Sequence, residues 1–307
     1  MPDLKNAPPA YGPDNAHYTD PGFRAEFVAD MERVSPFQQR FPAGITKLRY
    51  DPRKFDFCGI VGDTLAAAGV IDRGALSARA DRLEFLHELV APDDQVMDGS
   101  QQSAAARVLY EMPAAFASLY ERLLDEVVVP AIGLGPAHFQ KVPTFRVFFP
   151  NAPGYPGATS YHTDIQIGHN PREVNVFFPL VPCAETRSLL MAPLHESLQV
   201  WREYDYDFVR FGRDTQHDPA MQARCGRICQ PLRVGVGEIV VFDSRCMHAG
   251  PHNKTALTRV TFDARVLPVG DHALQQNVYQ GRGRRRASFA IGEYFSANAV
   301  GQRTLRR

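Results

Sequence analysis

The stretch that decides the fold is GEIVVFDSRCMHAGPHNKTALTRVTFDAR (237–265). It begins and ends with runs rich in Val and Phe, and Gly, Pro and Asn lie between these runs. Apolar runs that are bounded by turn residues in this way are typical of β-strands. We therefore predict a strand, a turn that carries His248, and a return strand that carries Arg259.

Other short runs with a period of two follow one another from about residue 140. They are VPTFRVFFP (142–150), EVNVFFPLV (173–181), RSLLMAP (187–193), CQPLRVGVGEIVVFD (229–243) and RVTFDARVLP (259–268). Residues 21–135 differ, because their apolar side chains recur at intervals of three and four, as on one face of a helix. Many short strands after a helical region predict a mainly β fold, a jelly roll or sandwich with flanking helices.

The chain divides by composition into four successive parts. We predict a flexible arm at 1–20, a helical region that packs on the core at 21–135, a β core at 140–270 and a C-terminal extension at 271–307. Residues 196–224 interrupt the strands with an aromatic and charged insertion that is too long for a hairpin loop. This insertion is either a mobile lid, with Trp201 closing over a substrate, or a rigid layer on the N-terminal helices.

The composition restricts the classes of partner. The 307-residue chain has 34 Lys and Arg residues and 34 Asp and Glu residues, so no net field attracts nucleic acid or an anionic membrane. No apolar run is long enough to span a membrane, and the first residues lack the pattern of a signal peptide. The five cysteines have no framework spacing, which indicates reduced thiols. We expect a cytoplasmic protein with a small-molecule partner, and we leave a homo-oligomer open.

Two segments carry side chains that could bind a metal ion. In SYHTDIQIGH (160–169), one residue separates His162 from Asp164, so on an extended segment both side chains lie on the same face. His248, on the predicted turn, supplies a third ligand. Two imidazoles and one carboxylate form the facial triad that binds Fe(II) and leaves positions open for other ligands.

Two further side chains follow His248 on the return strand. Arg259 lies on that strand, and Thr261 follows it on the same face. A buried guanidinium at this place could pair with the distal carboxylate of 2-oxoglutarate while the other end of that molecule chelates the metal. Since a simple metal site does not require Arg259 and Thr261, these two residues favour an enzyme.

These motifs also carry a resemblance to a known family. With His162-x-Asp164, His248 and Arg259-x-Thr261, the chain resembles the Fe(II)/2-oxoglutarate-dependent dioxygenase superfamily over roughly residues 140–270. More narrowly, it is similar to the phytanoyl-CoA-hydroxylase-like branch and to the streptomycin-biosynthesis-type oxygenases.

The resemblance implies a double-stranded β-helix core and a particular set of ligands. It implies Fe(II) bound by His162, Asp164 and His248, with O2 as the second co-substrate. It also implies 2-oxoglutarate bound by Arg259, and we group Thr261 and Asn175 with this co-substrate. Relatives that have Gly or Ala at the aspartate position are halogenases, so Asp164 disfavours that activity.

Several other polar residues are candidates for substrate contacts. They are Arg146, His169, Glu173, Trp201 and Arg265. A charged side chain among apolar neighbours needs a partner, so Arg146 binds either a protein carboxylate or a substrate group. Arg265 could pair with an acidic neighbour, and His169 could stabilise a turn. His252 competes with His248 as a ligand, but its PHN context is more typical of a turn.

The sequence therefore predicts an oxygenase that hydroxylates an unactivated C–H bond. Its substrate is expected to be a small polar metabolite or natural-product intermediate that is amino-acid-like or sugar-like. Desaturation, epoxidation and ring formation stay open as outcomes of the same chemistry. An alternative of another class is a non-catalytic jelly-roll protein that binds a metal or a ligand.

Overall fold

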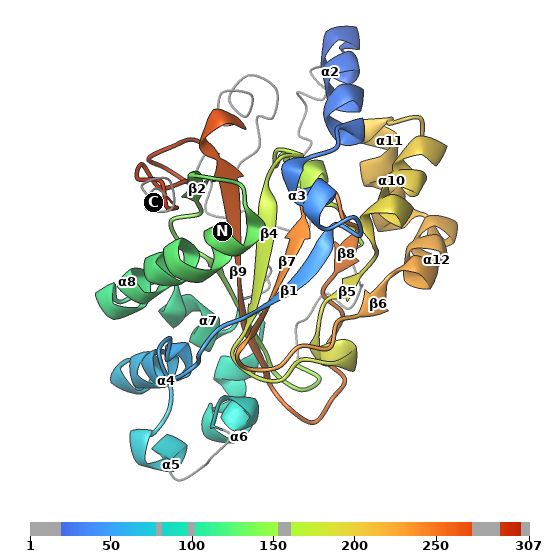
Figure 1. Ribbon diagram of the computed structural model, residues 1–307. Helices are drawn as coiled ribbons and strands as arrows, with labels where there is room; N and C mark the ends of the chain where they lie inside the picture. The colour runs from blue at the N-terminus through green and yellow to red at the C-terminus, as the bar shows by residue number, and fades with distance from the viewer. Residues whose placement is uncertain (1–19, 78–81, 98–101, 153–160, 272–288, 302–307) are drawn as a thin grey trace.

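The computed structural model describes residues 20–77, 82–97, 102–152, 161–271 and 289–301. Two antiparallel sheets lie at its centre, and helices surround them (Figure 1). Of the predicted flexible arm, all but Asp20 lies outside the described residues. Among the helices that the structure describes, none is both long and apolar enough to cross a membrane.

The larger sheet has six strands in the order β1-β7-β4-β9-β2, and β3 also pairs with β9. The smaller sheet has the order β6-β5-β8. The strands are β1 (Ile45–Arg49), β2 (Ala137–Phe139), β3 (Thr144–Phe148), β4 (Val174–Pro179), β5 (Leu190–Met191), β6 (Gln230–Pro231), β7 (Glu238–Asp243), β8 (His248–Ala249) and β9 (Arg259–Pro268). Two antiparallel sheets built from strands distant in sequence confirm the predicted mainly β, double-stranded β-helix core.

Strand β9 is buried on both faces, and its two faces have different chemistry. Val260, Phe262, Ala264 and Val266 alternate with Arg259, Thr261, Asp263 and Arg265. The apolar set packs beneath helices, since the Phe262 ring lies 5.4 Å from the Phe57 ring. The polar set faces the smaller sheet, because Arg259 donates to the Ser188 carbonyl just before β5. Register therefore determines which side chains of β9 enter the barrel.

The helices lie around the outside of the two sheets (Figure 1). They are α2 (Pro21–Glu32), α3 (Pro36–Arg40), α4 (Phe57–Ala67), α5 (Arg73–Ser77), α6 (Leu86–Leu89), α7 (Ala104–Leu109), α8 (Ala114–Leu123), α9 (Val129–Ile132), α10 (Leu194–Glu203), α11 (Phe208–His217) and α12 (Pro219–Ile228). Helices α4 and α8 pack on the larger sheet through Phe57 and Phe116. Pro113 is the residue directly before α8, and α7 has already ended at Leu109, so two separate helices form.

The region predicted to be helical also supplies a strand to the core. Strand β1 pairs with β7 at the edge of the larger sheet, with Ile45 opposite Phe242. Its side chains are half-buried or exposed, so the sequence has no apolar run there. Within 271–307, the described part also lies against the larger sheet, because Val300 pairs with Ala137 and Phe295 pairs with Gln140.

The insertion between β5 and β6 consists of α10, α11 and α12, beside the smaller sheet (Figure 1). The Trp201 side chain is fully buried and stacks on Phe211, with ring centroids 3.6 Å apart. The same ring also lies 5.4 Å from Phe27 of α2 and 6.2 Å from Phe208 of α11. The expectation that Trp201 contacts a substrate is therefore not met in this arrangement, because its ring packs inside the aromatic cluster with α2. Lid movement of the segment stays a proposal.

Candidate metal centre

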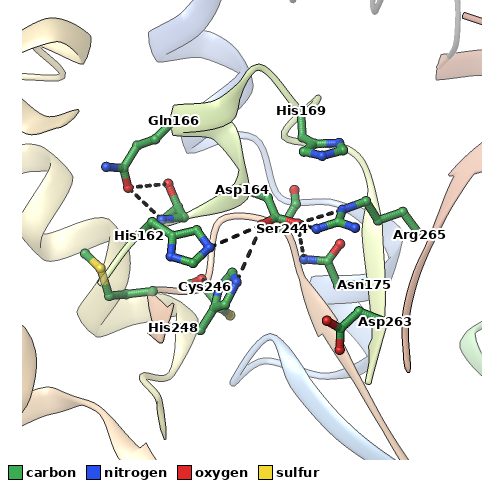
Figure 2. A network of polar contacts seen from close by, with 12 residues as sticks. His162, Asp164, Gln166, His169, Asn175, Ser244, Cys246, His248, Asp263 and Arg265 are labelled. Carbon is green, nitrogen blue, oxygen red and sulfur yellow. Dashed lines mark hydrogen bonds and ion pairs between the residues drawn. The ribbon is translucent and has the colours of Figure 1, made fainter. Parts of the chain in front are cut away.

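Three side chains that were separate in the sequence lie together inside the barrel. His162, Asp164 and His248 each offer one ligand atom, and these atoms all lie within 4.8 Å of one another (Figure 2). The two histidines are held by a backbone bridge: each amide donates to the other carbonyl, at 2.9 and 2.8 Å. A bridge of the smaller sheet thus positions both imidazoles.

Asp164 reaches the same point because the chain turns directly after Thr163. The predicted extended segment ends there, and Asp164 begins a 3-10 helix, η5 (Asp164–Ile167). The turn is stabilised by Gln166, whose Oε1 accepts from the Thr163 amide at 2.6 Å and whose Nε2 donates to Thr215 of α11 at 2.8 Å. Local capping therefore brings the carboxylate toward the imidazoles.

The His248 ring is oriented so that Nε2 faces Asp164. Nδ1 lies 3.0 Å from the Cys246 carbonyl, which can only accept, so we assign the Nδ1–H tautomer. Nε2 then presents a lone pair to Oδ1 of Asp164 at 3.5 Å, and Nε2 of His162 lies 3.9 Å from the same oxygen. The Nε2 lone pair and the carboxylate oxygen repel each other, and a cation bound between them would be attracted to both. The residues therefore fit a metal ion.

The two oxygens of Asp164 have different surroundings (Figure 2). Oδ2 accepts from Nδ2 of Asn175 at 2.9 Å and from Nε of Arg265 at 2.8 Å. Oδ1 is buried and accepts no hydrogen bond from the residues that the structure describes. Burial opposes ionisation, but the Arg265 guanidinium beside the carboxylate outweighs it and holds the pKa of Asp164 well below its usual range. The carboxylate is therefore an anion with one oxygen available.

Arg259 lies on the same inward face of β9. It is 1% exposed, and its guanidinium carbon lies 5.2 Å from the Phe148 ring and 5.3 Å from the Phe177 ring. Two hydroxyls beside it, Thr261 Oγ1 and Ser188 Oγ, are buried and have no hydrogen-bond partner within the described part of the chain. A cation and two unpaired hydroxyls together fit the carboxylate of an acidic ligand.

The structure gives protein partners to the remaining candidates. Arg146 pairs with Asp263 at 3.2 Å, which is the structural alternative left open for it. His169 and Glu173 form a buried pair at 2.8 Å, and the ring of His169 stacks on Phe289. Figure 2 shows both His169 and Arg265 near Asp164, although only Arg265 contacts its carboxylate. His252 is not part of the three-residue group.

Two residues of the site were missed by sequence reasoning. Nη1 of Arg265 donates to Oε1 of Gln140 at 3.2 Å and to the Tyr294 hydroxyl at 3.3 Å. Tyr294 belongs to the C-terminal extension, where the sequence gives no periodic signal. The inward position of Arg265 could have been found, because it shares the alternation of Arg259 and Thr261 along one strand.

Comparison with known proteins gives one curated relative. No family model matches the chain. The streptomycin biosynthesis protein StrG of Streptomyces griseus is 23% identical over 259 residues, which are 82% of this chain and 98% of StrG.

Solved structures give weaker overlaps. The non-heme, alpha-ketoglutarate-dependent carbocyclase SnoK from nogalamycin biosynthesis is 16% identical, with a TM-score of 0.40 over 88% of this chain and 98% of SnoK. EctD from S. alaskensis, solved with 2-oxoglutarate and 5-hydroxyectoine, is 14% identical, with a TM-score of 0.38 over 75% of this chain and 73% of EctD. The chain is thus similar over most of its length to a streptomycin biosynthesis protein, and the solved structures that it partly overlaps include 2-oxoglutarate-dependent enzymes.

Proposed function

We propose that this protein is a non-haem Fe(II)/2-oxoglutarate-dependent oxygenase. The observation that carries the proposal is the three-residue group itself, with two imidazole nitrogens and one carboxylate oxygen within 4.8 Å. Two histidines and one carboxylate are the donor set that Fe(II) oxygenases use, because it leaves positions for a co-substrate and O2. His162, Asp164 and His248 would bind the iron.

Arg259 would bind the distal carboxylate of 2-oxoglutarate. Its guanidinium is buried between two aromatic rings, where a charge-assisted pair is strong because little water competes. Thr261 adds a hydroxyl donor on the same face of β9. With iron bound, O2 would be the oxidant. 2-Oxoglutarate would supply two of the four electrons and leave as CO2 and succinate, which takes one oxygen atom, and the substrate C–H bond would supply the other two electrons and take the second oxygen atom. The residues of the chain orient the co-substrate and exclude water.

The substrate that we propose is a small polar, amino-acid-like or sugar-like molecule, and the reaction is hydroxylation of a C–H bond. The zero formal charge supports a small molecule rather than a nucleic acid. Two acceptors on the inward face, Asn175 Oδ1 and Asp263 Oδ1, are buried without a hydrogen-bond partner among the described residues, so a ligand with hydroxyl or amino donors would satisfy them. The similarity to StrG, a streptomycin biosynthesis protein, is consistent with this class.

Anaerobic titration with Fe(II) and then 2-oxoglutarate tests the proposal. We expect one Fe(II) per chain and a visible metal-to-ligand charge-transfer band when 2-oxoglutarate is added. The His162→Ala/His248→Ala variant should lose both signals. A matched control is His195→Ala/His217→Ala, because these histidines are exposed on α10 and α11 and should leave both signals unchanged. Equal iron binding by the first variant would refute the ligand assignment.

A second measurement separates an enzyme from a non-catalytic binding protein. Succinate formation that requires both O2 and 2-oxoglutarate marks the oxygenase, even before its substrate is known. A protein that binds iron but forms no succinate, with or without candidate small polar substrates, would support the non-catalytic alternative.

A further inference from the structure

The inference concerns how Asp164 presents its carboxylate, and it rests on the proposed function. Oδ2 of Asp164 accepts two hydrogen bonds, from Nδ2 of Asn175 at 2.9 Å and from Nε of Arg265 at 2.8 Å, and Nη2 of Arg265 lies 2.7 Å from it as an ion-pair contact. Oδ1 accepts none from the described residues. All three side chains are buried or nearly so.

This asymmetry has a consequence for metal binding. An oxygen whose two lone pairs already accept N–H groups, and which faces a third nitrogen of the guanidinium, has no lone pair left for a metal ion. Carboxylates otherwise bind metals through either one oxygen or two. We infer that Arg265 and Asn175 are positioning residues that restrict Asp164 to a single metal bond, through Oδ1. A second bond, through Oδ2, would take a position that the co-substrate or O2 needs.

Arg265 is itself held in place by groups from two other segments. Gln140 accepts from Nη1, and its own amide nitrogen donates to the Val142 carbonyl at 2.7 Å, which directs Oε1 toward the guanidinium. Tyr294 contacts the same Nη1 from the C-terminal extension. The guanidinium therefore has little freedom to rotate away from Asp164, and the C-terminal extension contributes to the site through Tyr294.

The charge balance agrees with a positioning role. Arg265 lies 2.7 and 2.8 Å from Oδ2 of Asp164 with no metal bound, so the positive charge that faces the carboxylate is already in place. The pair is thus formed in the metal-free protein, and its geometry exists before iron or co-substrate arrives.

The test compares metal affinity with affinity for 2-oxoglutarate and for nitric oxide, which occupies the position of O2. The full chain is prepared as Arg265→Met, Asn175→Leu and Arg265→Lys variants, with Arg227→Met, an exposed arginine of α12, as the matched control. Anaerobic Fe(II) titration gives metal affinity, the charge-transfer band gives 2-oxoglutarate affinity, and electron paramagnetic resonance reports the nitrosyl complex.

We expect Arg265→Met and Asn175→Leu to retain Fe(II) affinity within about tenfold, while their affinity for 2-oxoglutarate or nitric oxide falls by about 10- to 100-fold. Arg265→Lys, which keeps one charged donor, should recover part of the loss. If the parent protein binds no iron, the proposed function is wrong. If the parent binds iron and Arg265→Met forms the same complexes at the same concentrations, or loses iron altogether, the positioning role alone is wrong.

Discussion

Arg265 places both Nε and Nη2 against one oxygen of Asp164, at 2.8 and 2.7 Å, across 101 residues of sequence. Both side chains are almost fully buried, with 12% and 1% of their areas exposed. Removing one member of such a pair leaves the other charged and unpaired, which is costly in a medium that solvates charge poorly.

The stability of the metal-free protein should reflect this pairing. We expect Arg265→Met to lower the free energy of unfolding by about 3–5 kcal/mol, because Asp164 is left as an unpaired buried anion. The control is Arg202→Met, whose pair with Glu32 is exposed and should contribute about 0–1 kcal/mol. Urea denaturation measures both values. If both variants lose the same free energy of unfolding, water reaches the Asp164 carboxylate in the folded protein and the buried pairing is contradicted.

The co-substrate requirement should depend on Arg259. We expect Arg259→Ala to raise the 2-oxoglutarate concentration for half-maximal succinate formation by about 100-fold or more, since a buried charged pair contributes several kcal/mol. Arg259→Lys should restore only part of the lost affinity for 2-oxoglutarate, because an ammonium cannot form the two parallel hydrogen bonds of a guanidinium.

The comparison variant for this prediction is Arg146→Ala, whose partner in the structure is Asp263. It should change the 2-oxoglutarate requirement much less than Arg259→Ala does. If Arg259→Ala turns over at low 2-oxoglutarate, Arg146 or Arg265 has to bind the co-substrate instead.

Hydrogen exchange decides between a mobile lid and a rigid layer for residues 196–224. We expect the amides of α10 to be protected before substrate is added, because Trp201 is fully buried against Phe211 and Phe27. Exchange that is fast without substrate and slow with it would instead support the lid. Trp201→Ala should destabilise the protein by about 3–5 kcal/mol as a buried-aromatic truncation.

The cysteines should be unreactive toward iodoacetamide in the native protein. Burial raises the pKa of Cys58 and of Cys183 to about 11, and that of Cys225 to about 12. At pH 8 only about a thousandth of a thiol with a pKa of about 11 is the reactive thiolate. Alkylation, followed by mass spectrometry, should therefore be slow, quicken as pH rises, and become rapid in urea. Fast native labelling of Cys225 would contradict its burial.

The sequence by itself determined the strand pattern and the chemistry of the candidate ligands. Runs of Val and Phe bounded by turn residues predicted β4, β7 and β9, because a strand that is buried in the core requires apolar side chains. The spacing of His162 and Asp164 gave a metal-binding pair, since residue types carry their donor atoms in any fold. Their roles at the metal, and that of Arg259, stay proposals.

Tertiary structure decided which side chains meet. Alternation along β9 placed Arg265 on an inward face, but only the packing of distant segments gave it Asp164, Gln140 and Tyr294 as partners. Strand β1 was not predicted from the sequence, because an edge strand with half-exposed side chains needs no apolar run. Trp201 was placed by its contact with α2, far away in sequence. Contacts of this kind depend on the whole fold, because local sequence determines which face a side chain lies on but not what opposes it.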